Sequence, residues 1–332
     1  MTGFAVQRML TVPAAWPPTL VVVVDTEEEF DWNAPFNPAS TAVTNIASQY
    51  SAQHIFDVHG VVPTYVVDYP VATTPAAIAV LRGFAETGRC EIGAHLHPWV
   101  TPPAEGPVDA RHSYPGNLPP DLERRKLEAL TQAIVAGFGT RPAVYKAGRY
   151  GVGPATAGIL RDLGYGIDAS VVPHTDFSAD GGPDFTALPD QPFVIAPGLV
   201  ELPLSVQFTG ALHGIGRHVY PRLAGRFGAR LHLPGVAARL GLLERLRLSP
   251  EGHRFKDMLR QTRAALAGGT RLFMLTYHST TLLPGATGYV RDMTERDHFL
   301  ARLDGYCHTF LGRFGGRAST LTAVAAALGA GA

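Results

Sequence analysis

The sequence of 332 residues lacks several features that would assign it to a specialised class of proteins. It has two cysteines, Cys90 and Cys307, which are too few and too far apart for a disulfide framework or a thiolate metal site. Lysine plus arginine and aspartate plus glutamate both number 28, so the formal net charge is zero. This balance gives no reason to expect a nucleic-acid partner or an acidic tail.

Long hydrophobic runs and two common catalytic signatures are also missing. No stretch reaches the roughly 18 to 20 apolar residues of a membrane span. Residues 1–18 lack the unbroken apolar core of a signal peptide, because Gln7, Arg8 and prolines interrupt them, and we therefore expect a cytoplasmic protein. No strand leads into a Gly-x-Ser-x-Gly elbow or a Gly-x-Gly-x-x-Gly turn, which argues against serine hydrolases and dinucleotide-binding proteins.

What is present is a repeated alternation of apolar strands and amphipathic helices. The patterns predict strands at 20–24, 61–67, 90–94, 143–147 and 271–277, and helices at 41–59, 74–88, 121–138 and 291–311. Strands that alternate with helices favour a parallel sheet or barrel over a sandwich. We expect one α/β domain that spans residues 1–332.

Two of these strands lead directly into residues that can bind a metal ion. Asp25 and Glu27 follow the apolar run 20–24, and His95 and His97 follow the strand 90–94. Residues at i and i+2 of an extended segment point to the same side. Two imidazoles with one or two carboxylates are typical of an open hydrolytic metal site, although acidic residues also favour helix N-termini and lone histidines are often structural.

Three later stretches place further polar residues after strands. Arg149 and Tyr150 lie in a glycine-rich turn, Asp168 ends a short strand, and His278 follows the strand 271–277. An arginine in such a turn is suited to pair with a carboxylate, or it is an ordinary surface residue. Because parallel strands carry their ligands at one edge of the sheet, all of these residues are expected to lie in a single site.

The motifs in this order resemble those of the NodB-type polysaccharide deacetylases, carbohydrate esterase family four, and above all their lipopolysaccharide and surface-polysaccharide biosynthesis subgroup. The motifs that carry the resemblance are Asp25-Thr26-Glu27, Glu91 to Pro98 with His95-Leu96-His97, Arg149-Tyr150-Gly151, Asp168-Ala169-Ser170 and Leu275 to Ser279 with His278. The resemblance implies an irregular (β/α) barrel of the NodB-homology type and a divalent metal ion, with zinc expected.

The resemblance also assigns roles to single residues. Asp25 would be the catalytic base, Glu27, His95 and His97 the metal ligands, and His278 the acid that protonates the departing amine. Arg149 would keep Asp25 ionised, and Asp168 would orient His278 or stabilise its charge. Substrate binding is assigned to Trp99, Tyr150 and Tyr277, with a backbone N–H of the Tyr150 turn facing the oxyanion.

Two departures from the family pattern leave assignments open. The family has two adjacent aspartates where Thr26 separates Asp25 from Glu27, so the base and the ligand could be exchanged. The family's histidines are four residues apart, whereas here they are two apart and Trp99 stands at the fourth position. The second histidine ligand is therefore either His97 or another residue.

One region differs in composition from the rest of the chain. Residues 210–270 are expected to form a helical insertion, and between Arg217 and Arg263 eleven lysines or arginines stand against three acids. This basic surface would contact a phosphorylated glycolipid or a membrane, or it is simply the solvated side of ordinary helices.

We therefore expect a metal-dependent hydrolase that removes an N-acetyl group from an amino sugar of a polysaccharide or glycolipid. Two alternatives stay open, namely hydrolysis of another amide such as a cyclic ureide, and a catalytically silent barrel that binds glycan. The identity of the sugar and the oligomeric state do not follow from the sequence.

Overall fold

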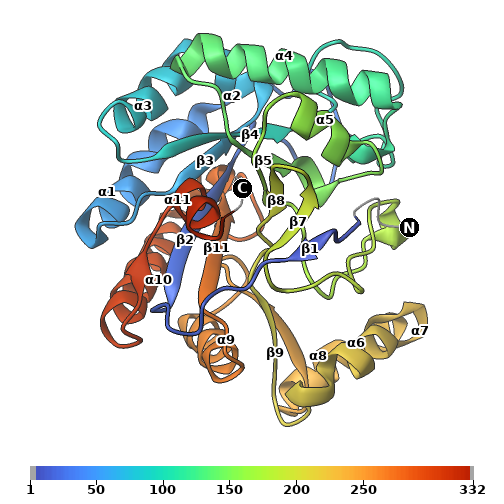
Figure 1. Cartoon of the computed structure of the whole chain (residues 1–332), viewed down its shortest axis with the longest axis vertical. Helices are drawn as coiled ribbons and strands as arrows, with labels where there is room; N and C mark the ends of the chain where they lie inside the picture. The colour runs from blue at the N-terminus through green and yellow to red at the C-terminus, as the bar shows by residue number, and fades with distance from the viewer. Residues whose placement is uncertain (1–4, 330–332) are drawn as a thin grey trace.

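The computed structural model describes residues 5–329, with the side chains of residues 226 and 229 excepted, and contains one large sheet with helices around it (Figure 1). The sheet consists of β1 (Arg8–Met9), β2 (Thr19–Thr26), β3 (Thr64–Val67), β4 (Glu91–Leu96), β5 (Val144–Ala147), β6 (Ile167–Asp168), β7 (Phe193–Ala196), β8 (Leu199–Glu201), β11 (Leu272–His278) and β12 (Arg317–Ala318). A separate ribbon pairs β9 (Val206–Thr209) with β10 (Glu244–Arg247).

Most of the large sheet is parallel. Strands β11, β2, β3, β4, β5, β6 and β8 are parallel neighbours in that order, whereas β7 is antiparallel to β8 and β1 is antiparallel to β7. All eight residues of β2 are buried, as expected for a strand that is covered on both faces. The prediction of an α/β fold with a mostly parallel sheet is confirmed.

The sheet does not close into a barrel within residues 5–329, because β11 and β1 are its two ends. Where a closed barrel would have another strand, β11 instead forms single hydrogen bonds with irregular segments. The amide of Met274 donates to Ser205 Oγ at 2.8 Å, and the amide of Thr276 donates to the carbonyl of Leu248 at 3.2 Å. The expected barrel is thus irregular and open on this side.

Helices cover the outside of the sheet. They are α1 (Gln49–His59), α2 (Tyr69–Thr73), α3 (Pro75–Ala85), α4 (Pro120–Phe138), α5 (Thr156–Asp162), α9 (Phe255–Ala267), α10 (Met293–Gly312) and α11 (Leu321–Ala327). In α4, Leu127, Leu130 and Ile134 are buried against the sheet at helical spacing, and Gly139 ends the helix at a φ of 74°. No helix of the described residues is long and apolar enough to cross a membrane.

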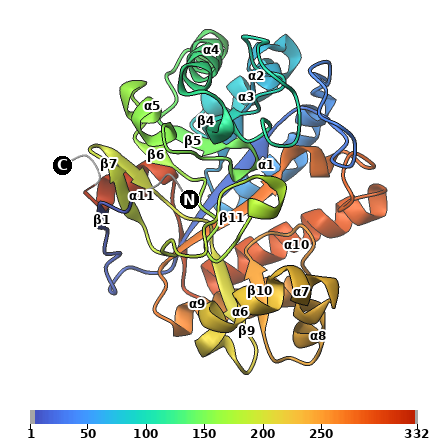
Figure 2. The same ribbon diagram turned by 90° about the vertical axis from the view of Figure 1, so that its right-hand side faces the viewer.

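The helical insertion is shorter than the sequence suggested. Helices α6 (Gly216–Ala224), α7 (Arg226–Arg230) and α8 (Leu233–Arg239) lie between β9 and β10, away from the large sheet (Figure 2). Helix α9, which the sequence placed in the insertion, instead buries Met258 and Ala265 in the main core. The insertion therefore ends at about residue 243.

Candidate active site

The polar residues that follow the strands meet at one edge of the sheet. Strand register explains this, because His278 of β11 lies beside Asp25 of β2 and His95 of β4 lies beside Lys146 of β5. A cavity of about 340 Å³ opens at this edge. The sequence-assigned residues that line it are Asp25, Glu27, His95, His97, Arg149, Tyr150 and His278.

Glu27, His95 and His97 each direct one donor atom toward a common point. Glu27 Oε2 lies 3.7 Å from His95 Nε2 and 3.4 Å from His97 Nε2, and the three donor atoms lie within 4.8 Å of one another. Donor atoms around a tetrahedral ion with bonds of 2.0–2.1 Å are about 3.3 Å apart. These three residues fit a divalent metal ion and leave room for a fourth ligand.

The other nitrogen of each imidazole is already engaged. His95 Nδ1 is 2.8 Å from the carbonyl of Lys146, and His97 Nδ1 is 2.7 Å from Glu28 Oε2. Both contacts place the proton on Nδ1 and leave Nε2 with its lone pair free for an ion. Metal-ligating histidines are commonly oriented by such carbonyl and carboxylate acceptors.

Burial controls the protonation of the three candidate ligands. It lowers the pKa of His95 well below the usual range, helped by His97, and lowers that of His97 to about 4. Both imidazoles are therefore neutral at pH 7, which is the form that binds metals. Burial, followed by the charges of Glu28 and Asp25, raises the pKa of Glu27 well above its usual range. Within residues 5–329 no lysine or arginine forms an ion pair with Glu27, and a divalent ion would supply the missing positive charge.

Glu28 lies next to the candidate ligands and accepts a hydrogen bond on each of its carboxylate oxygens. Oε2 accepts from His97, and Oε1 accepts from the indole N–H of Trp99 at 2.7 Å. The ring of Trp99 also stacks on His97 with centroids 4.3 Å apart. Asp68 accepts from the amide of Glu28, and burial raises the pKa of Asp68 well above its usual range. Although Glu28, Asp68 and His97 form a second cluster of potential ligands, these contacts already satisfy Glu28.

Asp25 is paired with Lys146, not with Arg149. Lys146 Nζ donates to both carboxylate oxygens, at 2.5 Å to Oδ2, and both side chains are buried. Burial alone would raise the pKa of Asp25, but Lys146 and, next, His95 and His278 bring it down to about 2. The expected role of Arg149 is corrected in this respect, because a buried lysine from β5, three strands away from β2 in the sheet, holds Asp25 ionised.

Arg149 instead packs among aromatic rings at the rim of the cavity. Its guanidinium lies 4.1 Å from the ring centroid of Tyr114 and 5.2 Å from that of Phe36, and it donates to Ser113 Oγ. Arg149 and Tyr150 have φ angles of 53° and 61° in the short 3₁₀ helix Gly148–Tyr150. Backbone strain of this kind at two successive non-glycine residues is typical of functional turns.

His278 is oriented by Glu251, not by Asp168. Glu251 Oε2 lies 2.9 Å from His278 Nδ1, and Glu251 Oε1 accepts from the His278 amide at 2.8 Å. This leaves His278 Nε2 3.6 Å from Asp25 Oδ2. Burial opposes ionisation of Glu251, but the charge and hydrogen bonds of His278, together with Thr281, lower its pKa below the usual range.

Asp168 lies outside the cavity and in contact with a different carboxyl group. It accepts a hydrogen bond from Ser170 and lies in register with Glu201 of β8. Burial raises the pKa of Asp168 to about 7 and that of Glu201 well above its usual range. The assignment of Asp168 to His278 is therefore wrong, because its side chain and that of Glu201 engage each other.

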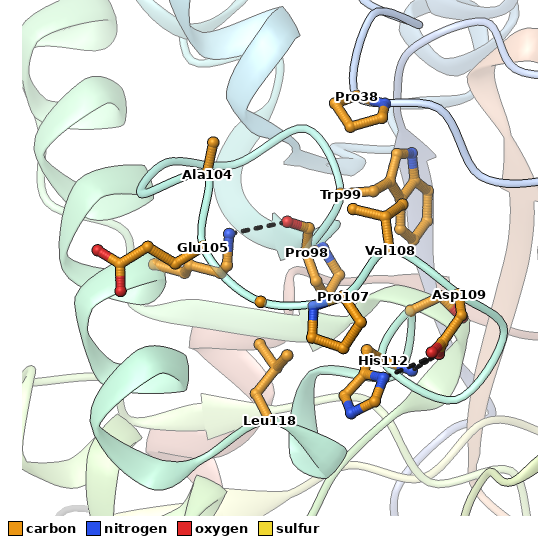
Figure 3. Close-up of a pocket in the computed structure, with 13 residues that line it drawn as sticks. Pro38, Pro98, Trp99, Ala104, Glu105, Pro107, Val108, Asp109, His112 and Leu118 are labelled. Carbon is orange, nitrogen blue, oxygen red and sulfur yellow. Dashed lines mark hydrogen bonds and ion pairs between the residues drawn. The ribbon is translucent and has the colours of Figure 1, made fainter.

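Two of the three residues assigned to substrate binding do not reach the cavity. Tyr277 is buried, and its hydroxyl donates to Gln49 Oε1 at 3.1 Å. Trp99 lies on the wall of a second, smaller cavity of about 120 Å³ that the loop 98–118 lines (Figure 3). Both assignments are corrected. Side chains alternate along a β-strand, so Tyr277 points away from the site while His278 points into it. Trp99 contacts Glu28 and His97 on the side away from the cavity.

Tyr150 does line the main cavity, together with aromatic residues that the sequence did not indicate. Its hydroxyl accepts from Arg247 Nη1 at 2.5 Å, and Arg247 also lines the cavity. The other aromatic residues of the lining are Phe30, Trp32, Phe36, Tyr114, Phe177 and Tyr289. These rings surround the polar residues on several sides.

Several polar residues of the site were missed from the sequence, among them Glu28, Lys146, Glu251 and Arg247. A lysine inside an apolar strand is a signal that was available, since lysine is almost never fully buried unless it is paired. Glu251 follows Ser249-Pro250, which is also the pattern of a helix start. Arg247 is one of many arginines in a basic stretch, and nothing in the sequence distinguishes it.

Comparison with solved structures identifies related folds. A Mycobacterium smegmatis protein provisionally named a polysaccharide deacetylase superimposes with a TM-score of 0.59 at 18% identity, over 98% of this chain and 95% of that chain. This similarity shows that the chain has the fold of that protein.

Two further structures superimpose less well, with TM-scores below 0.5. A family 4 acetyl xylan esterase from Clostridium thermocellum, in complex with cobalt, has a TM-score of 0.44 at 12% identity, over 93% of this chain and 91% of that chain. A family 4 pseudoenzyme from Bacillus anthracis has a TM-score of 0.43 at 9% identity, over 92% and 65%. No protein-family model and no curated protein sequence matches the chain.

Proposed function

We propose that the chain is a metal-dependent hydrolase that removes an N-acetyl group from an amino sugar of a polysaccharide or glycolipid precursor. The observation that carries the proposal is the convergence of Glu27 Oε2, His95 Nε2 and His97 Nε2 beside an ionised Asp25 in one cavity. The fold shared with the mycobacterial protein, whose name places it among polysaccharide deacetylases, supports the same reaction class.

Glu27, His95 and His97 would hold a divalent ion, and we take zinc as the first candidate. Such an ion supplies Lewis-acid polarisation of the amide carbonyl and makes a nucleophile available from water near neutral pH. The contacts of His95 with the Lys146 carbonyl and of His97 with Glu28 hold both imidazoles in the correct tautomer before the ion binds.

Asp25 would accept the proton of the attacking water. Lys146 keeps it ionised, and both partners are held by strands of the same sheet, Asp25 by β2 and Lys146 by β5, so the carboxylate is in place before substrate binds. A positioned base of this kind typically contributes about 10² to 10⁴ to the rate. This assignment makes Glu27 the ligand, and the contact of Glu27 with both histidines supports it.

His278 would protonate the nitrogen of the departing amine, which cannot leave as an amide anion. Glu251 fixes the ring through Nδ1 and the backbone amide, so that Nε2 faces Asp25 and the cavity. A backbone N–H of the strained Tyr150 turn would donate to the oxyanion of the tetrahedral intermediate.

The aromatic lining supports a carbohydrate as substrate. Apolar faces of sugar rings pack on aromatic side chains, and Trp32, Tyr150 and Tyr289 lie on the wall of the cavity near the reacting groups. Trp32 contacts His278 directly, with ring centroids 4.8 Å apart. The arrangement is suited to hold a sugar with its acetamido group directed toward Glu27 and Asp25.

Acetate release tests the proposal. Protein stripped with a chelator would be assayed on N-acetylglucosamine oligomers and on hydantoin, before and after one equivalent of Zn²⁺ is added. We expect acetate release from the oligomers that depends on the added ion. His95→Ala should be inactive, whereas His54→Ala, at an exposed position on α1, should behave as wild type.

The other outcomes identify the alternatives. Opening of hydantoin without acetate release would indicate a hydrolase of cyclic amides. Binding of an oligomer without any hydrolysis, in protein shown to contain the ion, would indicate a silent glycan-binding protein and would contradict the proposed reaction.

A further inference from the structure

A small helical arm projects from the body of the molecule. We define it as residues 212–242, which contain α6, α7 and α8 and are joined to the body through β9 and β10 (Figures 1 and 2). The cluster that packs it against β9 and β10 is small, consisting of Ala237 of the arm with Phe208 and Leu243 at its base and a few partly buried neighbours. So small a cluster leaves much of the arm's apolar surface uncovered.

Exposed apolar side chains are concentrated on this arm. Among the described residues sixteen large hydrophobic side chains are exposed, and seven of them lie within residues 212–242. These seven are Leu212, Ile215, Phe227, Leu231, Val236, Leu240 and Leu242. Phe227 is 76% exposed and Leu240 is 67% exposed. Single exposed hydrophobic residues are ordinary, but a concentration of them in one projecting element marks an interaction surface.

The charge of the arm has one sign. No aspartate or glutamate occurs between Glu201 and Glu244, although five arginines lie in this stretch of a chain whose net charge is zero. Arg217, Arg222 and Arg239 are exposed on α6 and α8. The arm therefore combines exposed apolar residues with positive charge that no acidic residue of the arm neutralises.

We propose that the helical arm binds the surface of an anionic lipid bilayer. Phe227 and Leu240 would enter the boundary between headgroups and acyl chains, and the arginines would contact lipid phosphates. This combination of apolar and cationic side chains on short helices is what an interfacial site requires, whereas nucleic acid would match the arginines alone.

A second copy of the chain is a less suitable partner. In a two-fold symmetric dimer the same surface of each copy meets the other, so the arginines of one arm would face those of its partner. Like charges brought together in this way oppose association. An anionic membrane is complementary to both properties of the arm.

Vesicle co-sedimentation of the 332-residue chain tests the proposal, and it measures lipid binding without any enzymatic assay. Wild type is expected to sediment with vesicles that contain 30% phosphatidylglycerol, at least tenfold more than with pure phosphatidylcholine, and to dissociate in 0.5 M salt. Phe227→Ser with Leu240→Ser should reduce binding at least tenfold. Arg217→Gln, Arg222→Gln and Arg239→Gln should each cost about fivefold.

Matched substitutions elsewhere provide the control. Tyr50 and Val58 on α1 are also exposed, at 57% and 65%, so Tyr50→Ser with Val58→Ser should leave vesicle binding unchanged. Equal sedimentation of wild type and the Phe227/Leu240 variant, or equal binding to neutral and anionic vesicles, would overturn the proposal. So would a lipid-free dimer, seen by analytical ultracentrifugation, that this variant abolishes.

Since the readout is lipid binding, failure of this test leaves the proposed deacetylase reaction unaffected, and failure of the acetate assay leaves the membrane site unaffected.

Discussion

The main cavity has two halves that balance their charges in different ways. One half consists of Glu27, His95 and His97, and the other consists of Asp25, Lys146, Glu251 and His278. On one side Glu27 faces two neutral imidazoles, and within the described residues no lysine or arginine forms an ion pair with it. On the other side Asp25 is paired with Lys146, and Glu251 with His278. The carboxylates Asp25, Glu27 and Glu251 are all buried at the same edge of the sheet, so depth does not explain the difference.

This contrast indicates what each half does. A buried carboxylate without a cation is costly, and binding a divalent ion removes that cost. Buried groups whose charges are already matched need no ion, and they hold donors and acceptors in fixed positions for proton transfer. The contrast supports the proposal that Glu27, His95 and His97 bind the ion and that Asp25 and His278 transfer protons.

The largest expected effect comes from removing a candidate ligand. Glu27→Gln keeps the size of the side chain but removes the carboxylate charge, so both the affinity for the ion and the activity should be lost. The loss of activity should exceed the roughly 10² to 10⁴ that a single acid or base contributes. Zinc titration followed by the acetate assay would measure both. Wild-type zinc affinity in this variant would remove the distinction between the two halves.

A second prediction separates Glu251 from Asp168. Glu251→Gln weakens the orientation of His278 and should lower kcat by about 10- to 100-fold, whereas His278→Ala should cost about 10² to 10⁴. Asp168→Asn should retain kcat within about threefold, because Asp168 interacts with Ser170 and Glu201 outside the cavity. Steady-state kinetics on a confirmed substrate measures all three. A larger loss in Asp168→Asn than in Glu251→Gln would reverse the assignment.

A third prediction concerns the partner of Asp25. Lys146→Met leaves Asp25 buried without its cation and should lower the free energy of unfolding by about 3–5 kcal/mol. Arg149→Met removes contacts with Tyr114 and Phe36 and should cost about 1 kcal/mol or less. Urea unfolding monitored by circular dichroism compares the two variants. Equal losses would show that Lys146 is not the principal partner of the carboxylate.

The smallest expected effect tests a buried carboxyl group away from the cavity. Burial raises the pKa of Glu123 on α4 to about 7. Its contribution to stability is thus fully present below its ordinary pKa of about 4.5 and is lost as the pH rises through 7. Glu123→Gln should therefore match wild type at pH 4 and be more stable by about 1–3 kcal/mol at pH 8. Thermal melts of wild type and Glu123→Gln at pH 4 and pH 8 measure this difference. Equal stability of the two proteins at pH 8 would contradict the prediction.

The strand ends could be predicted from the sequence because each follows from a local pattern. The apolar run before Asp25, the pair His95 and His97, and the strand before His278 each identify a strand and the polar residue at its end. In a parallel sheet these ends share one edge, so local patterns were sufficient to bring the main groups together.

The pairing of those groups could not be predicted, because it depends on register and on loops. Lys146 meets Asp25 only through the order of β2 to β5, and Glu251 reaches His278 from a segment between β10 and α9. Tyr277 and Trp99 show the same limit, since their positions beside His278 and His97 in the sequence do not determine the direction of their side chains.

Metal content measured side by side in two variants tests the assignment of the two halves most directly. Wild type, His95→Ala and Asp25→Asn would be stripped, reloaded with Zn²⁺, desalted and analysed for bound ion. We predict about one ion per chain in wild type and in Asp25→Asn, and none in His95→Ala, while both variants are inactive. An absence of bound ion in wild type, or equal loss in both variants, would contradict the account.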